Sequence, residues 1–271
     1  MIANTILNSR LDAWGFLVLT LATLWMGRRI TLRKCPGHRC PKLILLMVAV
    51  LAAAGLWFTE YSDRMERAQI RELVSGLAPT FAYELTSLGH QKIGLNTAPD
   101  DPLYLSLIER EKTWLKLNPD VADIYTYRRL PDGRIVFIVD SETDYDHNGR
   151  YEGERESRTP IGESYDTPTE NTLKALAGQP AFDPKVVTDQ WGSWISYDQP
   201  MFDGHGNVEA VLGVDFSASE WVSAILFARA TSLLITYVII VILFSTFVLI
   251  SLMRAEIADR AAIQLQLGRA K

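Results

Sequence analysis

Acidic side chains are concentrated in one short segment of the chain, between residues 140 and 156. The run from Asp144 to Glu154 alternates acids and amides, and Gly149 permits a sharp turn within it. Ca²⁺ takes six to eight oxygen ligands, which such alternation supplies, although the twelfth loop position holds Arg155 instead of a bidentate glutamate. We therefore predict a loose calcium site, with a solvated acidic turn as the alternative. Its candidate ligands are Asp144, Asp146, Asn148, the Arg150 carbonyl, Glu154 and Glu156.

A second group of residues suits a small organic ligand. Residues two apart in a strand share one face of the sheet, and aromatic walls with a few polar groups are typical of ligand pockets. Asp215 follows an apolar run, where a buried carboxylate needs a partner or a cationic ligand group. The alternative is that the aromatics are core and Asp215 caps the following helix. The predicted binding residues are Tyr125, Tyr127, Phe137 (with Val139 on the same face), Trp194, Ser196 and Asp215.

Catalytic chemistry is poorly represented. Residues 60–228 contain three histidines, His90, His147 and His205, and no cysteine, and they show no Ser-His-Asp order or HExxH motif. The chain contains no Gly-rich nucleotide loop and no GGDEF-like motif. We expect no enzymatic activity and no organic cofactor.

The segments that position these residues read as a mixture of helix and antiparallel sheet. A helix begins near Glu60, with Pro79 expected to kink or break it. Its apolar stripe could pack on a second copy of the chain or face its own sheet; the stripe comprises Met65, Ile70, Leu73, Leu77, Phe81 and Leu85. A second helix is expected to have Asp100 or Asp101 as its cap and Pro102 in its first turn. Period-two runs at 121–130 and 134–140 form one predicted hairpin, and those at 191–202 and 208–216 form another. A short helix between them is expected to begin at Thr167 or Thr169 and end at Gly178. The fold class is therefore α+β.

Three uncharged apolar runs, 13–27, 43–59 and 230–253, flank this region. A membrane-spanning helix needs about 20 apolar residues. The third run is long enough, the second is slightly short, and the first has only 15 residues. Because arginines follow the first run instead of preceding it, we predict a membrane helix there and not a signal peptide.

The charge distribution predicts the orientation of the three helices. The chain has a net charge of −5, but residues 59–228 carry −14 and the rest carries +9. Basic loops remain cytoplasmic, so the acidic region is expected outside. The predicted organisation is 1–59, two transmembrane helices with a basic cytoplasmic loop; 60–228, an outer domain; 229–253, a third transmembrane helix; and 254–271, the start of a coiled-coil linker. The acidic balance argues against nucleic acid as a partner.

The run YTYRRLPDGRIVFIVDSE, then PIGESYD, then TDQWGSWISYDQPMFDGHGNVEAVLGVDF resembles the extracytoplasmic Cache or PDC domain, a PAS-like sensor fold of bacterial receptors. The resemblance implies five or six antiparallel strands behind a long N-terminal helix, with a ligand pocket on one sheet face. It also implies a membrane-anchored homodimer. In amino-acid-binding relatives, an Asp placed like Asp215 holds the ligand amine, and an Arg placed like Arg128 or Arg129 holds the carboxylate.

We therefore expect a sensory input module in the bacterial inner membrane, multi-pass, with its sensor domain periplasmic or extracellular. It would bind a small molecule and signal through the third transmembrane helix to a histidine kinase output. The alternatives are an input module of a diguanylate cyclase and a non-catalytic adaptor that binds a partner protein.

Overall fold

The computed structural model describes residues 9–34, 42–145, 148–153, 156–166, 168–188 and 192–269. These residues form two compact units. The first comprises residues 67–224 and contains the sheet, and the second comprises residues 9–66 and 225–269.

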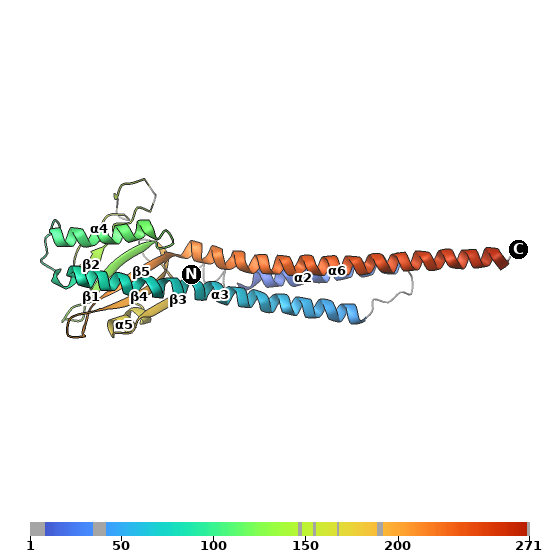
Figure 1. Cartoon of the computed structure of the whole chain (residues 1–271), viewed down its shortest axis with the longest axis horizontal. Helices are drawn as coiled ribbons and strands as arrows, with labels where there is room; N and C mark the ends of the chain where they lie inside the picture. Colours follow the sequence, from blue (N-terminus) through green and yellow to red (C-terminus); the bar gives the residue numbers. More distant parts are fainter. Residues whose placement is uncertain are drawn as a thin grey trace. The chain divides into compact units, whose positions relative to one another are not determined.

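The first unit is built on a five-stranded antiparallel sheet with the order β2-β1-β5-β4-β3. Two hairpins form most of it, as predicted: β1 (Asp123–Arg129) with β2 (Ile135–Asp140), and β4 (Ser193–Phe202) with β5 (Val208–Ser217). The strands lie between helices α4 and α5 in Figure 1. Because β1 and β5 are adjacent in the centre, residues from both hairpins meet there.

Strand β3 (Ala181–Thr188) was not predicted from the sequence. Its run AFDPKVVT contains Pro184, and proline removes a ladder hydrogen bond, so it is confined to edge strands and bulges. Strand β3 is an edge strand, and its pairing with β4 shifts register between Asp183 and Val187. The irregular ladder accommodates the proline.

Helix starts follow their sequence signals. Helix α4 (Pro102–Leu117) begins after Asp101, whose side chain accepts hydrogen bonds from the backbone N–H groups of Leu103 and Tyr104. Helix α5 (Glu170–Leu176) begins after Thr169 with a reciprocal cap involving Thr172. Both caps lie at positions that the sequence had indicated.

Helix α3 (Lys42–Leu88) continues through Pro79, so the predicted break does not occur. Its residues within the first unit turn one side inward, where Val74, Ala78 and Leu85 are fully buried. Phe81 stacks on Trp114 of α4, with ring centroids 4.2 Å apart. Burial of this face supplies a tertiary stabilisation that outweighs the hydrogen bond lost at a proline.

The β1–β2 pair contains a bulge. Tyr125 lies opposite Asp140, whereas Tyr127 lies opposite Phe137, so β2 uses one more residue than β1 over this stretch. A bulge reverses the alternation of side chains beyond it. Asp140 therefore lies on the same sheet face as Phe137. Simple alternation had instead predicted that Val139 shares this face with Phe137.

The second unit consists of helix α2 (Leu11–Lys34) with residues 42–66 of α3 and residues 225–269 of α6 (Ala218–Arg269). In the described part of the chain, two helices, α3 and α6, have the length and apolar character needed to cross a membrane. Helix α2 is not among them, so the sequence prediction of three transmembrane helices is supported for two. The charged ends of α2 restrict its uncharged run to 15 residues.

Polar contacts and small residues accompany an apolar cluster in the packing of the second unit. The Arg229 guanidinium donates to Asp12 Oδ1 at 2.8 Å, and the Thr23 and Tyr237 hydroxyls lie 2.9 Å apart, so α2 and α6 run in the same direction. The Ser62 and Ser232 hydroxyls lie 3.1 Å apart. A Cβ at Gly55 would lie 2.4 Å from Thr236, so α3 and α6 run antiparallel in close contact.

Candidate functional site

A small cavity lies on one face of the sheet, beneath the connection that follows β2. It receives side chains from β1, β2, β4 and β5 and from residues 143–165. Its volume is about 30 Å³, which is room for about two water molecules. The lining residues are Asp123, Tyr125, Phe137, Asp140, Thr143, Tyr145, Glu156, Ser157, Thr159, Tyr165, Trp194 and Asp215.

The central strand β5 makes room for the cavity through a glycine. Gly213 lies opposite Tyr125, and a Cβ there would lie 2.6 Å from the tyrosine ring. Any side chain at this position would displace the ring, because real Cβ contacts of this length do not occur. The Tyr125 ring therefore lies across β5, in edge contact with Phe137 at a centroid distance of 5.6 Å.

The structure brings together four of the six ligand-binding residues predicted from the sequence. Tyr125, Phe137, Trp194 and Asp215 line the cavity. Tyr127 does not, because its ring stacks on Tyr165 at 5.2 Å, within an apolar cluster that also includes Val211 and Ala175. Ser196 lies opposite Asp215 in the sheet and is also absent from the lining.

Asp123 is the most densely hydrogen-bonded acid of the cavity. Its Oδ1 accepts from the hydroxyls of Ser141 and Thr143 at 2.8 and 2.7 Å, and its Oδ2 accepts from Tyr145 at 3.1 Å. Asp140 accepts from the backbone N–H of Thr159 at 2.6 Å. These donors are all neutral, so they orient the two carboxyls without cancelling their charge.

The buried acids oppose one another electrostatically. Burial, reinforced by the charge of Asp140, raises the pKa of Asp123 to about 7. Burial also raises the pKa of Asp140. Glu111 of α4 is fully buried, and its pKa is raised well above the ordinary value by burial and then by the charges of Asp140 and Asp123. Three acidic groups on three elements therefore share one poorly solvated region.

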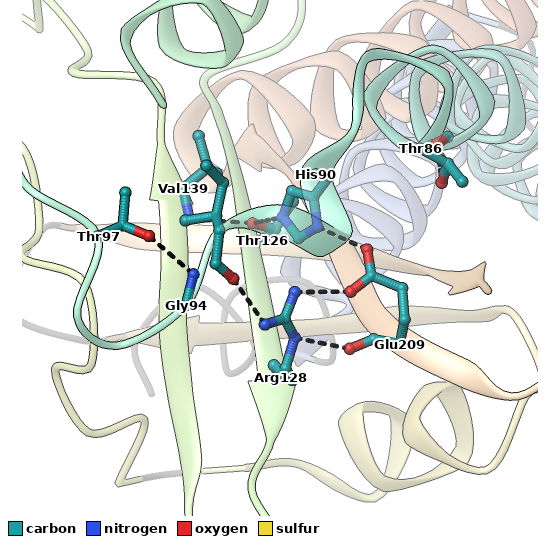
Figure 2. Close-up of polar contacts among 10 residues, drawn as sticks. Thr86, His90, Gly94, Thr97, Thr126, Arg128, Val139 and Glu209 are labelled. Carbon is teal, nitrogen blue, oxygen red and sulfur yellow. Dashed lines mark hydrogen bonds and ion pairs between the residues drawn. The ribbon is translucent and has the colours of Figure 1, made fainter. Parts of the chain in front are cut away.

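Arg128, a candidate for binding a ligand carboxylate, lies in a different cluster, shown in Figure 2. Its guanidinium donates to Glu209 Oε2 at 2.6 Å, to the Glu209 carbonyl at 2.8 Å and to the Ile93 carbonyl at 2.9 Å. Arg129, the other candidate, lines a separate open pocket with Leu130. Neither arginine is among the residues that line the small cavity.

His90 completes this cluster on the sheet face opposite Tyr125. Its Nδ1 lies 2.6 Å from Glu209 Oε1, and its Nε2 lies 2.8 Å from the Thr126 hydroxyl (Figure 2). That hydroxyl also accepts the backbone N–H of Val139 at the bulge, at 3.0 Å. His90 is fully buried and follows the end of α3, so the cluster ties that helix to the bulge.

The predicted calcium ligands lie in the connection after β2, and Asp146 and Glu154 are outside the described residues. The Asp144 carboxylate accepts the backbone N–H groups of Asn148 and Gly149, and the Asn148 side chain accepts that of Arg150. Glu156 accepts the N–H of Tyr145 at 2.9 Å. Within the described ranges, no three His, Cys, Asp or Glu residues are grouped to hold a metal ion. The calcium site stays a prediction.

Three acids of the site were missed by sequence reasoning, namely Asp123, Asp140 and Glu111. Asp123 lies at the start of a strand, where no sequence pattern distinguishes it. The sheet face of Asp140 could not be predicted, because it depends on the bulge. Glu111 was detectable, because it interrupts the apolar side of α4 between Leu107 and Trp114, both of which are buried.

No family model and no curated protein matches the chain. Among solved structures, it is similar to the ligand-binding domain of the Campylobacter jejuni chemoreceptor Tlp3 in complex with L-valine (12% identity, TM-score 0.41, covering 66% of each chain). It is also similar to the sensor domain of the V. cholerae histidine kinase DctB (14%, 0.44, 67% of this chain and 59% of that one). A third is the periplasmic domain of RsbU from Chlamydia trachomatis (14%, 0.32, 60% and 57%).

These structures are sensor domains of the kind that the sequence resembles. The chain covers no more than 66% of any of the three. With TM-scores below 0.5, the similarities carry no inference about the ligand, the output or the oligomeric state.

Proposed function

We propose that the chain is the sensory input module of a membrane receptor, and that the small cavity is its ligand site. The observation that carries the proposal is the position of Asp215. It lines the cavity and lies three residues before the start of α6, one of the two helices apolar enough to cross a membrane. A ligand that contacts Asp215 acts at the origin of that helix without an intervening loop.

We propose three transmembrane helices, with the sheet-containing unit outside a bacterial inner membrane. The parallel direction of α2 and α6 and the antiparallel direction of α3 are those that two inward crossings and one outward crossing require. The acidic charge of residues 59–228 supports the same orientation. In this proposal α6 passes the signal to a histidine kinase output, with a diguanylate cyclase as the alternative, and the chain itself performs no chemical step.

We also propose a homodimer formed through α3. Helix α3 exposes Leu73 in the first unit and Met65 in the second, at 42% and 51%. Both belong to the apolar stripe for which the sequence offered self-association and packing on the domain's own sheet as equal alternatives. Phe81 and Leu85, from the same segment, are instead buried within the unit.

The ligand site is tested with the full-length chain in lipid nanodiscs, screened by thermal shift against a library of small metabolites. We expect at least one compound to raise Tm, and the Trp194→Leu variant to lose that response. Phe202→Leu, on the same strand but outside the cavity, is the matched control and should keep the response. If no compound raises Tm, or if both variants respond like the parent, the cavity is not the ligand site.

Signalling is tested by fusing the chain after Lys271 to the phospho-acceptor and kinase domains of a reporter sensor kinase. We expect the compound found in the screen to change autophosphorylation in the parent fusion and not in the Trp194→Leu fusion. Binding without any change in autophosphorylation would favour the adaptor alternative over a kinase input.

The calcium prediction is tested separately, by isothermal titration of the same protein with CaCl2. Extracellular sites of this kind bind at about 10⁻⁴ to 10⁻³ M. We expect Asp144→Ala to abolish the heat, with MgCl2 as the ionic control. A parent protein that gives no heat at millimolar CaCl2 would leave the loop as an acidic turn.

A further inference from the structure

The charged residues that line the small cavity are all acidic. They are Asp123, Asp140, Glu156 and Asp215, and among the described residues the lining includes no lysine, arginine or histidine. These acids come from β1, β2, β5 and the connection after β2, so different elements contribute charge of one sign to one space. A ligand carboxylate entering this space would meet four carboxyls and no cationic side chain in the lining.

Two basic side chains, Lys112 and Arg158, are bound to an acid outside the lining. Lys112 donates to Glu142 Oε2 at 3.2 Å, and Arg158 lies 3.5 Å from Glu142 Oε1. Glu142 is not a lining residue, so these two bases neutralise an acid beside the cavity. The hydrogen bonds to Asp123 and Asp140 come from hydroxyl and backbone groups, which carry no charge.

Glu111 of α4 is a further buried acid near this acidic space, although it is not a lining residue. It is fully buried, and both of its carboxylate oxygens lack a hydrogen-bond partner. Its surroundings include Asp123 and Asp140, whose charges act on it. A buried acid without a partner either retains its proton or needs a compensating positive charge.

The remaining walls of the cavity are aromatic. Tyr125, Phe137, Tyr145, Tyr165 and Trp194 line it, and the rings of Tyr145 and Trp194 lie 5.6 Å apart. Aromatic faces attract ammonium groups, and the attraction is stronger where water is excluded. Acids together with aromatic rings are therefore complementary to an organic cation. Among the described residues, no three acids or histidines are grouped to hold a metal ion.

We propose that the cavity binds an organic cation, a compound that carries one or more ammonium groups and no carboxylate. This inference rests on the proposed function and specifies its ligand class. It departs from the expectation for amino-acid ligands, because the arginine that would hold a carboxylate is bound to Glu209 in another cluster.

Three probes with the same four-methylene chain separate the ligand classes: 1,4-diaminobutane, 5-aminopentanoate and adipate, which carry charges of +2, 0 and −2. Each is titrated calorimetrically into the full-length chain in nanodiscs made of zwitterionic lipid, with butylamine as the monocation. We expect the two amines to bind at least tenfold more tightly than 5-aminopentanoate, and adipate to give no heat. Asp140→Asn should weaken amine binding at least tenfold. Asp120→Asn, an exposed acid near Asp123 but outside the lining, is the matched control and should leave binding unchanged.

The outcomes distinguish this inference from the proposed function. Tighter binding of adipate or 5-aminopentanoate that Trp194→Leu abolishes would overturn the cation and leave the ligand site in place. Absence of binding by all four probes, with a positive hit elsewhere in the metabolite screen that carries a carboxylate, would overturn the cation as well. If MgCl2 or CaCl2 alone competes fully with 1,4-diaminobutane and Asp140→Asn abolishes the metal heat, the site takes a metal ion and the inference is wrong. A misfolded Asp140→Asn is bypassed with Glu156→Gln, which removes a lining charge from the connection after β2.

Discussion

Asp123 illustrates how one buried side chain makes this domain sensitive to its surroundings. Its carboxyl is held by three hydroxyls while it faces Asp140 from β2, Glu111 from α4 and Asp215 on the neighbouring strand β5. Near neutral pH, these acids reduce their mutual repulsion by retaining protons. The raised pKa of Asp123 results from its burial and from the negative charge of Asp140.

The pH dependence of stability follows from this residue with a definite sign. A carboxyl whose pKa is about 7 when folded and about 4 when unfolded binds more protons in the folded state between those values. The free energy of unfolding should therefore fall as pH rises from 5 to 7, by at most about 1.4 kcal/mol per pH unit for each such group. Asp198, whose pKa burial also raises to about 7, contributes to the same slope.

The measurement is Tm of the ligand-free chain in nanodiscs between pH 5 and 8. Asp123→Asn should flatten the slope without removing it, because Asp198 still titrates. Asp132→Asn, an exposed acid in the β1–β2 turn, serves as control. A slope in Asp123→Asn equal to that of the parent would contradict the assignment.

At the scale of elements, strand β1 separates two polar systems. Tyr125 points into the cavity, whereas the neighbouring Thr126 bonds to His90 on the other face. Burial would raise the pKa of Glu209, but the hydrogen bonds and charges of His90 and Arg128 outweigh it and lower that pKa. The charged cluster in Figure 2 thus connects the end of α3 to the sheet.

Disruption of the Glu209 cluster should destabilise the folded protein. Glu209→Gln leaves the Arg128 guanidinium, 20% exposed, without its carboxylate, and removal of one partner of a buried pair costs about 3 kcal/mol or more. Tm should fall by roughly 6 °C or more. Glu170→Gln breaks an exposed pair with Lys174 on α5 and should leave Tm almost unchanged. Equal Tm shifts for the two variants would show that the Glu209 cluster does not stabilise the fold.

A separate prediction concerns dimer formation through the exposed residues of α3. In a background with Cys35 and Cys40 replaced by serine, Leu73→Cys should form a disulfide between two copies under mild oxidation. Val74→Cys, on the adjacent but fully buried position, should not. A Leu73→Cys protein that stays monomeric on non-reducing gels would argue against the dimer.

At the scale of the whole molecule, two units are built in different ways. The sheet unit combines an apolar core with buried acids, whereas the helices of the second unit combine an apolar cluster with small residues and a few polar contacts. Gly27 is one example, because a Cβ there would lie 2.3 Å from Phe244. Small residues at such contacts are typical of helices packed in membranes.

The course of the three helices can be checked by cross-linking. With the native cysteines replaced by serine, Thr23→Cys with Tyr237→Cys should be joined within one chain by a short bis-maleimide, because the two side chains meet with their hydroxyls 2.9 Å apart. Thr23→Cys with Thr246→Cys, further along α6, is the matched control and should not. Cross-linking of both pairs, or of neither, would contradict a parallel α2 and α6 in the assembled protein.

The sequence predicted those parts of the molecule that depend on local patterns. Both hairpins, the helix caps at Asp101 and Thr169, and four cavity residues follow from periodicity and residue type. The bulge in β2 does not, because the ladder shift depends on pairing with β1 and not on β2 itself. Neither does the contact of His90 with Glu209, which lie 119 residues apart and meet only when the sheet forms.

The size of the cavity has a kinetic consequence. A space of about 30 Å³ holds water but no metabolite, so only a wider and less populated form of the domain can accept a ligand. The apparent affinity is then the intrinsic affinity reduced by the fraction of molecules in that form. The observed association rate should level off at high ligand concentration at the rate of opening. In this scheme the residence time, and hence the duration of a signal, is set by the rate at which the ligand-bound form reopens.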